Sequence, residues 1–475
     1  MTLFQLVWAI IKIAIMVGFV VNTAAILTWF DRRGGAAIQD RVGPNRAVIK
    51  IGKFEIRLAG LLHPLADGLK FFTKEFFMPP KADKLLFRLA PILSMMPVMA
   101  LVAVIPFGDA LCTSDLHGSI DGSLLGAFPS VPRFGVCNAI AEHDVFGVDH
   151  AILGHVSAVL PVDLIIAPLS VGILYVFAMA GQGIVGAAIA GWSSDNKFSL
   201  MGALRAASQM VSYEVAMGLS LIGAMMIYGT VRLDEMVRWQ GEHTWGIFAQ
   251  PLGFILFYVA ATAENKRIPF DLPEAESELV SGYFTEYSGM SFGMFYFAEY
   301  MEIITGAMLT TTIFLGGYEL PFLHRDGFTV EFGGTQVWHQ VMPHIWVTIF
   351  QIVAFFTKVL AMCWLHAIIR WSLPRFRYDQ LMKLGWRVLL PLGLANVVVT
   401  GVVYCAIAQG GAGISDTFQV VAQSTQALIA FAITAGVVWL IVGFFKPRTK
   451  NPTIIGTAGK YAEATGGTPV TPMQA

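Results

Sequence analysis

Apolar runs long enough to cross a lipid bilayer recur along almost the whole length of this chain of 475 residues. A helix needs about 20 mostly apolar residues to span the hydrocarbon core. The runs are continuous and do not alternate with polar residues, which argues against a membrane β-barrel. Only 13% of the residues are charged, about half the share found in soluble globular proteins. The sequence therefore predicts an all-α polytopic membrane protein.

We expect about nine transmembrane helices in this chain. Their approximate bounds are residues 3–29, 90–107, 157–180, 206–229, 247–264, 291–317, 343–369, 387–408 and 423–445. Basic residues in short loops indicate the cytoplasmic side of a membrane protein. They gather in residues 31–89 and 370–387, whereas the long loop 108–156 contains only Arg133. With nine helices, the N-terminus is expected outside and the C-terminus in the cytoplasm.

A single membrane domain is expected to cover residues 1–445. Its loops are predicted on the cytoplasmic side at residues 31–89, 264–290 and 370–387, and on the outer side at residues 108–156. Residues 446–475 are rich in Pro, Gly and Thr, which predicts a disordered cytoplasmic tail.

The first cytoplasmic loop contains a second kind of helical pattern. Leu65, Leu69, Phe72 and Phe76 follow helical spacing, and charged residues occupy other positions of the helical wheel. This arrangement predicts an interfacial amphipathic helix.

Composition and motifs exclude several classes of function. The formal net charge is −1, so the chain offers no bulk basic field to nucleic acid. Its four cysteines form no C-x-x-C pair, so they cannot supply the usual ligands of an iron–sulfur cluster or a clustered zinc site. Cys112 and Cys137 share the outer loop and could form a disulfide only in an oxidising compartment. The run GQGIVG, residues 181–186, follows a predicted membrane helix instead of the strand that a dinucleotide site needs.

The connection around residues 264–290 concentrates negative charge in an otherwise apolar chain. Its carboxylates are Glu264, Asp271, Glu274, Glu276, Glu278 and Glu286, and its basic residues are Lys266 and Arg267. Pro269 and Pro273 exclude a continuous helix through its first part. Glu274 and Glu278 are four residues apart, so we expect them on one helical face, where like charges raise each other's pKa.

Apolar residues are interleaved with these acids, which favours a binding surface over a solvated acidic loop. Phe270, Leu272, Leu279 and Tyr283 stand among the carboxylates. An apolar surface lined by carboxylates at the edge of the membrane suits an amphiphilic ligand and proton exchange. The alternative is an acidic loop that binds nothing in particular.

Further acids stand inside the predicted helices. Glu214 belongs to the fourth helix, and Glu299 and Glu302, three residues apart, share one face of the sixth. A charged carboxylate at mid-membrane costs several kcal/mol, which excludes a position facing lipid. Each could be paired with an arginine or protonated for structural reasons alone. Together with the charged connection, Glu214, Glu264 and Glu299 favour a proton relay.

Four long stretches of the sequence are distinctive: HPLADGLKFFTKE, GWSSDNKFSLMGALRAASQMVSYEV, AENKRIPFDLPEAESELVSGYFTEYSG and PRFRYDQLMKLGW. They resemble the H-subunit family of respiratory NADH:quinone oxidoreductase (complex I), and the last helix and tail resemble its bacterial members. The resemblance covers about residues 25–400 and implies a multi-pass subunit of the bacterial inner membrane, at the junction with the hydrophilic arm of the complex. There it would form much of the quinone-access chamber and begin a chain of buried charges used in proton translocation.

The resemblance also implies roles for individual residues. The quinone chamber would be lined by Asp31, Arg32, Gln39, Arg41, Arg267, Phe270, Asp271, Glu274, Glu276 and Glu278. The proton path would include Tyr213, Glu214, Glu264 and Glu299. The surface that docks partner subunits would include Arg46, Asp67, Lys70, Lys74, Arg375, Arg377 and Asp379. Asp31 and His63 depart from the family pattern, which often has Glu and Gln there, and Glu302 is not part of that pattern.

The same resemblance implies the cofactors and partners. Quinone, as ubiquinone or menaquinone, is the expected substrate, and no metal is expected in this chain. FMN and iron–sulfur clusters would belong to partner subunits of the hydrophilic arm, and small membrane subunits would lead on to antiporter-like chains. The isolated chain is then expected to be inactive. Two alternatives stay open: the equivalent subunit of a membrane-bound hydrogenase or of a ferredoxin-linked or deazaflavin-linked complex, and a stand-alone cation/proton antiporter.

Overall fold

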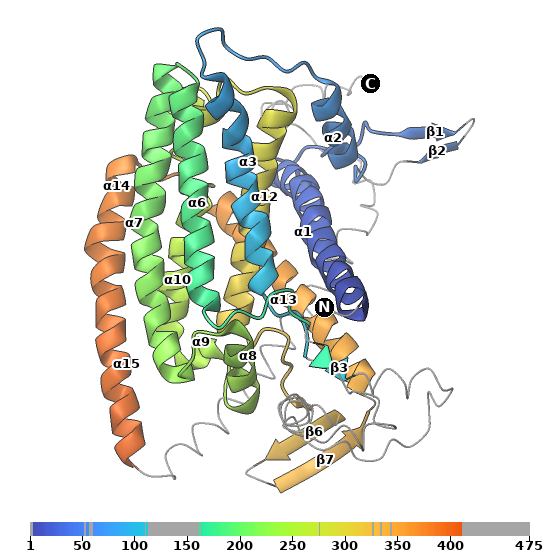
Figure 1. The fold of residues 1–475 in the computed structure, drawn as a ribbon, viewed down its shortest axis with the longest axis vertical. Coiled ribbons are helices and arrows are strands. Elements are labelled where there is room, and N and C mark those ends of the chain that lie inside the picture. The colour runs from blue at the N-terminus through green and yellow to red at the C-terminus, as the bar shows by residue number, and fades with distance from the viewer. Residues whose placement is uncertain are drawn as a thin grey trace, which may run out of the picture.

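A computed structural model of the chain describes residues 3–109, 111–112, 161–162 and 164–410, apart from residues 52–53, 57–59, 275, 325–326, 333–334 and 343. The long helices lie alongside one another and form a bundle (Figure 1). They are α1 (Leu3–Ile38), α3 (Lys84–Leu101), α6 (Gly172–Ser193), α7 (Lys197–Tyr228), α10 (Pro251–Glu264), α12 (Gly289–Phe314), α13 (His344–Ser372) and α15 (Leu390–Gly410). Six helical segments of the described chain are long and apolar enough to cross a membrane. The expected class, a helical multi-pass membrane protein, agrees with these findings.

Shorter elements gather at the two ends of the bundle (Figure 1). One end, called here the α2 end, carries α2 (His63–Thr73) and two short paired strands, β1 (Ile49–Ile51) and β2 (Phe54–Ile56). The other, called here the hairpin end, carries α8 (Leu233–Glu242), α9 (Gly246–Ala249) and the antiparallel strands β5 (Leu323–His324), β6 (Gly327–Phe332) and β7 (Thr335–Val341). Strands β3 (Leu111–Cys112) and β4 (Pro161–Val162) pair with each other. The expectation of a purely helical chain overlooked these strands, which are short and confined to connections.

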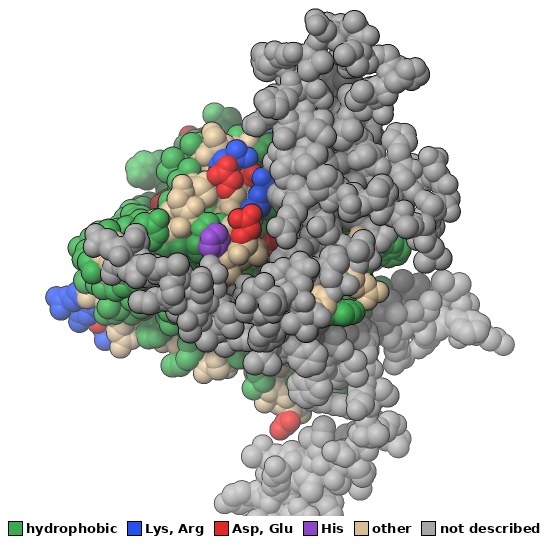
Figure 2. All heavy atoms as spheres, turned by 90° about the horizontal axis from the view of Figure 1, so that it is seen from below, with side chains coloured by type: hydrophobic (Ala, Val, Ile, Leu, Met, Phe, Trp, Pro, Cys, Tyr) green, Lys and Arg blue, Asp and Glu red, His purple; other side chains and the backbone are tan. Residues whose placement is uncertain are grey.

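The described residues at the hairpin end carry few charges on their surface. Seen from this end, the described part shows mostly hydrophobic and uncharged side chains, with a group of acids and bases near the middle and a few charged side chains elsewhere (Figure 2). Arg232, directly before α8, pairs with Asp234 at 2.8 Å and with Glu235 at 3.3 Å. The basic residues of the described chain are concentrated instead in the sequence around the α2 end.

Several predicted helix bounds are wrong. The third helix was expected at residues 157–180 but begins at Gly172 and ends at Ser193, because Pro161 and Pro168 interrupt the apolar run before it. The eighth helix was expected from residue 387. Instead, α14 (Tyr378–Lys383), a π-helical turn (Leu384–Leu389) and α15 run on without a break, so little of the expected loop 370–387 is a loop.

Polar residues in the first or last turn explain the differences in the bounds of α1 and α7. Such residues lower the mean hydropathy of the segment, so the predicted apolar run stops before the helix does. Helix α1 continues to Ile38, which places Asp31 and Arg32 inside a helix. Helix α7 begins at Lys197, where the side chain of Asn196 accepts a hydrogen bond from the Phe198 amide and caps the helix.

The remaining predictions differ in how far the described residues test them. The amphipathic helix is confirmed as α2, with Leu65, Leu69 and Phe72 exposed, but it ends at Thr73 and does not include Phe76. Its place at a membrane interface stays a prediction. The run GQGIVG lies within α6 and follows no strand. The ninth helix, the tail, most of the loop 108–156 and the Cys112–Cys137 pairing lie outside the described residues.

Helix α12 occupies the centre of the bundle. It packs against α1, α3, α10 and α13, and most of its side chains are buried. Its end is closed by Lys358 on α13, whose ammonium donates hydrogen bonds to the carbonyls of Leu315, Gly317 and Glu319 at 2.8, 3.0 and 2.6 Å. Polar groups on α12 are therefore held in a fixed position inside the protein.

Candidate functional site

The acidic connection between α10 and α12 folds back against the bundle and is not an open loop. Gln209 on α7 donates hydrogen bonds to the carbonyls of Ala263 at 2.7 Å and Phe270 at 2.9 Å. The amide of Phe376 donates to the Pro269 carbonyl at 3.0 Å. The ring of Phe270 is buried and stacks on that of Phe376, with centroids 5.4 Å apart. These contacts attach the connection to α7 and to the segment before α14.

Two glycines allow the connection to approach α7 closely. Gly282 has φ +62°, a conformation that favours glycine. A Cβ atom on Gly202 of α7 would lie only 2.7 Å from Cα of Gly282. The backbone therefore touches the helix directly, and this contact brings Tyr283 into the interior.

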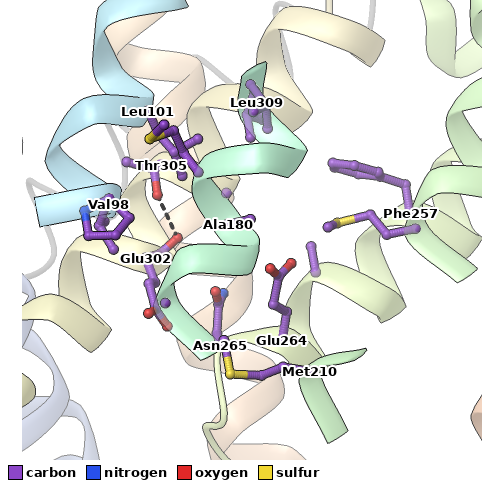
Figure 3. Close-up of a pocket in the computed structure, with 17 residues that line it drawn as sticks. Val98, Leu101, Ala180, Met210, Phe257, Glu264, Asn265, Glu302, Thr305 and Leu309 are labelled. Carbon is purple, nitrogen blue, oxygen red and sulfur yellow. Dashed lines mark hydrogen bonds between the residues drawn. The ribbon is translucent and has the colours of Figure 1, made fainter. Parts of the chain in front are cut away.

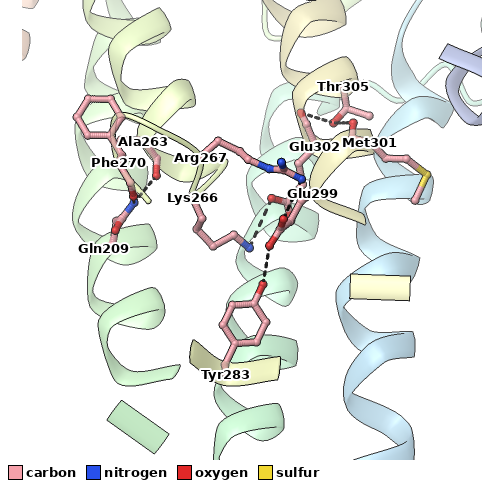
Figure 4. A network of polar contacts seen from close by, with 10 residues as sticks. All are labelled: Gln209, Ala263, Lys266, Arg267, Phe270, Tyr283, Glu299, Met301, Glu302 and Thr305. Atoms are coloured by element: carbon pink, nitrogen blue, oxygen red, sulfur yellow. Dashed lines mark hydrogen bonds and ion pairs between the residues drawn. The ribbon is translucent and has the colours of Figure 1, made fainter. Parts of the chain in front are cut away.

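Arg267 and Glu299 form the centre of a buried polar network (Figure 4). Their closest N and O atoms are 3.0 Å apart, and both side chains are almost fully buried. The guanidinium lies 4.2 Å from the ring centroid of Tyr300, and the hydroxyl of Tyr283 donates to Glu299 at 3.1 Å. Buried charges are tolerated best when they are paired and hydrogen-bonded. Glu299 has both an ion-pair partner and a hydrogen bond, whereas Nε and Nη2 of Arg267 have no hydrogen-bond partner among the described residues.

Two further acids of the connection, Glu274 and Asp271, lie beside this pair, and the pKa of each is raised. Burial and the neighbouring Glu299 raise the pKa of Glu274 well above its ordinary value. Burial, opposed by Arg375, raises the pKa of Asp271 to about 6. Among the described residues, Oε1 of Glu274 and Oδ1 of Asp271 have no hydrogen-bond partner. The surroundings of both carboxyl groups therefore favour the protonated form, and Asp271 can change its protonation state near neutral pH.

A second ion pair joins three helices next to the network. Asp31 on α1 forms an ion pair with Arg370 on α13 and accepts a hydrogen bond from the Tyr300 hydroxyl of α12 at 3.0 Å. Tyr300 is thus shared between Asp31 and Arg267. Asp31, where the family often has Glu, still reaches a basic partner.

The third pair, Lys266 and Glu302, lies between the network and a cavity among the long helices. Nζ of Lys266 lies 3.5 Å from Oε2 of Glu302; Lys266 is buried, and the side chain of Glu302 is 15% exposed. Burial by itself would lower the pKa of Lys266, but Glu302 and Glu299 raise it above its ordinary value. Lys266 therefore stays charged.

A cavity of about 50 Å³ begins at this third pair (Figure 3). Its polar lining comes from Glu264, Asn265, Glu302 and Thr305, and the rest is mostly apolar side chains of α3, α6, α7, α10 and α12. Glu214 lies against α6, since a Cβ on Gly181 would be 3.6 Å from its Oε1. The expectation that Glu299 and Glu302 share one face of a helix agrees with their pairing to adjacent residues, Arg267 and Lys266.

The expected pairing of Glu274 and Glu278 on one helical face is wrong. The helix there is a single turn, α11 (Glu276–Leu279), and it does not include Glu274. Glu278 instead faces outward, with 56% of its side chain exposed, and it pairs with Arg205 at 2.7 Å. The hydrogen bond from Arg205 lowers the pKa of Glu278, opposite to the expected rise. The side chain of Glu276 lies outside the described part of the structure.

Other predicted chamber residues lie around a surface hollow at the α2 end. Arg32 pairs with Asp67 at 2.6 Å, and Arg41 donates to Gln39 at 2.6 Å. The hollow has a volume of about 410 Å³, and its charged lining is Arg32, Arg41 and Arg46. Phe270 does not line either hollow, because it is packed beneath the connection. Tyr213 is buried and donates to the Leu381 carbonyl at 2.9 Å.

The predicted docking residues divide into exposed and engaged groups. Arg46, Lys70 and Lys74 are exposed, and Arg377 pairs with Asp379 at 3.2 Å on the surface. Asp67 is engaged by Arg32, and Arg375 lies close to Asp271 in the network.

Sequence reasoning missed three members of the network. Tyr300 follows Glu299 directly and could have been suspected from the stretch FAEY. Arg370 was counted only among the basic residues of a loop, and Tyr283 only as an apolar neighbour of the acids. No local signal joins Arg370 to Asp31, since the two are far apart in the chain.

A bundle of apolar helices that encloses several ion pairs and protonatable acids at one end defines a class, the polytopic membrane proteins with a buried ionisable network. The particular family follows from comparison: the chain belongs to the NADH dehydrogenase family, whose model matches residues 11–139 and 150–401. The resemblance seen in the sequence is thereby confirmed.

Individual relatives cover most of the chain. It is similar to the NADH-quinone oxidoreductase H subunit 1 of Cytophaga hutchinsonii, with 40% identity over 374 residues, 79% of this chain and 90% of the relative. It is also similar to the H subunit of the same enzyme in Thermomicrobium roseum, with 38% identity over 410 residues, 83% of this chain and 97% of the relative. The H subunit 1 of Geobacter metallireducens is 40% identical over 390 residues, 82% of this chain and 94% of the relative.

Proposed function

We propose that this chain is the membrane subunit of a proton-pumping NADH:quinone oxidoreductase that forms the quinone-access chamber and couples quinone reduction to proton translocation. The observation that carries the proposal is the buried network of Arg267, Glu299, Glu274 and Asp271, which lies next to the membrane cavity lined by Glu264. The names of the relatives, all called H subunits of NADH-quinone oxidoreductase, support it.

The chamber wall is assigned to the α2 end of the chain. Asp31 and Arg32 at the end of α1, Gln39 and Arg41 beyond it, and Arg267, Asp271 and Glu274 of the acidic connection supply polar groups around an apolar surface. A quinone needs an apolar passage for its tail, and polar groups and protons for its head. Asp271, with a pKa of about 6, and Glu274 are suited to respond to the charge of the reduced quinone. Glu276, Glu278 and Phe270 are assigned to the same region, Phe270 as a support beneath it.

Protons are assigned a path from this cluster into the membrane. Glu299 joins the connection to α12, Glu264 lines the cavity, and Glu214 lies nearby on α7. A change of charge at the quinone alters the proton affinity of the nearest acids, since charges in a low-dielectric surrounding interact strongly. Tyr213 is assigned a supporting role, through its hydroxyl contact with Leu381.

The proposed membrane topology has nine spans, with the N-terminus outside and the C-terminus in the cytoplasm of a bacterium. The course of the described helices supports it: α1 runs from the hairpin end to the α2 end, and later helices alternate in direction (Figure 1). The basic stretches thus fall at the α2 end, which is assigned to the cytoplasm. Residues 1–445 form one domain of the inner membrane in this proposal, followed by the tail 446–475.

The partners are proposed to meet this chain at the α2 end. Exposed charged residues near α2 and at the start of α14 are assigned to contacts with the hydrophilic arm. Among them are Arg46, Lys70, Lys74, Arg377 and Asp379. FMN and iron–sulfur clusters in those partners supply electrons to ubiquinone or menaquinone, and the isolated chain has no oxidoreductase activity of its own. Small membrane subunits carry the charge relay onward.

Purification of the tagged chain from its native membrane tests the assembly. We expect iron–sulfur proteins with NADH:quinone activity to co-purify, and we expect the chain reconstituted alone in liposomes to exchange no cations for protons. Hydrogenase or ferredoxin-dependent activity in the purified assembly would favour the related complexes. Cation/proton exchange by the chain alone, abolished by Glu214→Gln, would show an antiporter and contradict the proposal.

A further inference from the structure

Lys266 and Glu302 stand at the boundary between two parts of the site. On one side is the network of the acidic connection, in which Glu299 contacts Arg267 and Tyr283. On the other side is the cavity of about 50 Å³ that contains the carboxylate of Glu264. Glu302 belongs to both, since it pairs with Lys266 and lines the cavity (Figures 3 and 4).

The contact between Lys266 and Glu302 is loose for a buried ion pair. Its N to O distance is 3.5 Å, whereas charge-assisted hydrogen bonds of this kind are about 2.7–2.9 Å long. Oε2 of Glu302 is buried and has no hydrogen-bond partner among the described residues. Lys266 also has a positive φ of 55°, which is uncommon for a residue with a side chain. The ammonium is therefore held beside Glu302 without fixing its oxygen in a short hydrogen bond.

The cavity has the size and the polar lining to join two carboxylates by water. A water molecule needs about 10–15 Å³ of such volume and two to four polar partners, so about 50 Å³ accommodates a few. Glu264, Asn265, Glu302 and Thr305 supply the partners, and Asn265 lies between the two carboxylates in the close-up (Figure 3).

We propose that Glu302, positioned by Lys266, is the carboxylate through which the acidic connection exchanges protons with the membrane cavity. This deepens the proposed function and rests on it. A proton that arrives from the connection forms the carboxylic acid of Glu302. That O–H bond then breaks while an O–H bond forms on Glu264, by way of water in the cavity, and Glu302 returns to the carboxylate that pairs with Lys266. No electron is transferred in this step.

The competing explanation is a purely structural pair, in which Lys266 only neutralises Glu302. Replacement of a buried ion pair by two neutral side chains is often harmless to stability, whereas loss of one partner leaves an unpaired charge. A structural pair therefore predicts that the double variant Lys266→Met with Glu302→Gln works as well as the parent. A proton-carrying Glu302 predicts that this double variant stays impaired.

The test uses the assembled complex in proteoliposomes. For Glu302→Gln we expect at least a tenfold loss of coupled NADH:quinone turnover, in the range of general acid–base effects. The KM for quinone and the reduction of ferricyanide by NADH should be unchanged. Glu302→Asp, which keeps an ionisable group, should retain most of the turnover. The double variant has no unpaired buried charge, so it serves if the single variant fails to assemble.

The pH dependence of turnover distinguishes the two explanations, because a purely structural pair predicts that it stays unchanged. Glu302 faces Lys266 and Arg267 from the connection, Glu299 from its own helix and Glu264 from α10. Lys266→Met removes the nearest positive charge, so Glu302 should keep its proton to higher pH. The pH at which turnover falls to half on the alkaline side of the profile should then be higher in Lys266→Met than in the parent. The double variant should show no such increase.

Glu264→Gln separates failure of this inference from failure of the proposed function. Parental turnover and pumping in Glu302→Gln or in the double variant, together with a loss in Glu264→Gln, would overturn only the role of Glu302. Parental behaviour of Glu264→Gln as well would overturn the proton path itself.

Discussion

Arg267 is the residue on which the buried network depends most. It pairs with Glu299 and lies against the rings of Tyr300 and Tyr296, while the neighbouring Lys266 engages Glu302. Removal of one partner from a buried ion pair costs about 3–5 kcal/mol. The surroundings of Glu274 and Asp271 favour protonation, because burial raises the pKa of both carboxyl groups. The arrangement therefore places protonatable acids next to buried ion pairs.

Asp271 gives a pH-dependent prediction at the residue scale. Its pKa of about 6 lies above its ordinary value of 3.8, so the folded protein binds this proton more tightly than the unfolded chain. The corresponding stability is complete below the ordinary pKa and is lost as pH rises through about 6. Asp271→Asn cannot ionise, so its thermal stability relative to the parent should increase from pH 5 to pH 7.5.

The measurement is the midpoint of thermal unfolding of the purified complex at pH 5, 6 and 7.5. Asp379→Asn, at an exposed carboxylate on the same side, serves as the control and should show no such trend. A difference between Asp271→Asn and the parent that stays constant with pH would mean that Asp271 does not titrate in this range.

The elements around the site act as supports of fixed shape. Helix α7 presents Gln209 and Gly202 to the acidic connection, and α12 presents Glu299, Tyr300 and Glu302. Because Lys358 closes the end of α12, that helix cannot slide freely along its axis. The connection itself is only one helical turn and several irregular residues, so its shape depends on these supports.

The contact between Gly202 and Gly282 gives a prediction at this scale. A methyl group on Gly202 would overlap the backbone of the connection at 2.7–2.8 Å, so Gly202→Ala should displace the connection from α7. We expect a several-fold loss of coupled quinone turnover, although alanine favours an isolated helix by about 0.5–1 kcal/mol. Gly218→Ala on the same helix is the matched control, because the nearest atom to its Cβ is 3.9 Å away in Phe177. Equal turnover in the two variants would show that the close contact is not needed.

For the whole molecule, periodicity and composition were enough to predict the helix bundle, because apolar runs in a membrane have few alternatives to helix. The common helical face of Glu299 and Glu302 could also be predicted, because residues three apart lie on the same side of a helix. Pairing across the bundle could not be predicted, as for Asp31 with Arg370, because packing and not local sequence brings them together. Glu274 and Glu278 were misjudged because the connection forms only one turn there, so its tertiary contacts decide where each carboxylate points.

The central claim is that buried carboxylates of this chain carry the protons that quinone reduction sets in motion. Proton pumping by the assembled complex in proteoliposomes, driven by NADH and followed with a pH-sensitive dye, tests it most directly with Glu264→Gln against Glu235→Gln on α8 at the opposite end. We predict that Glu264→Gln loses most of its pumping while Glu235→Gln pumps as the parent does. Parental pumping by Glu264→Gln would contradict the account.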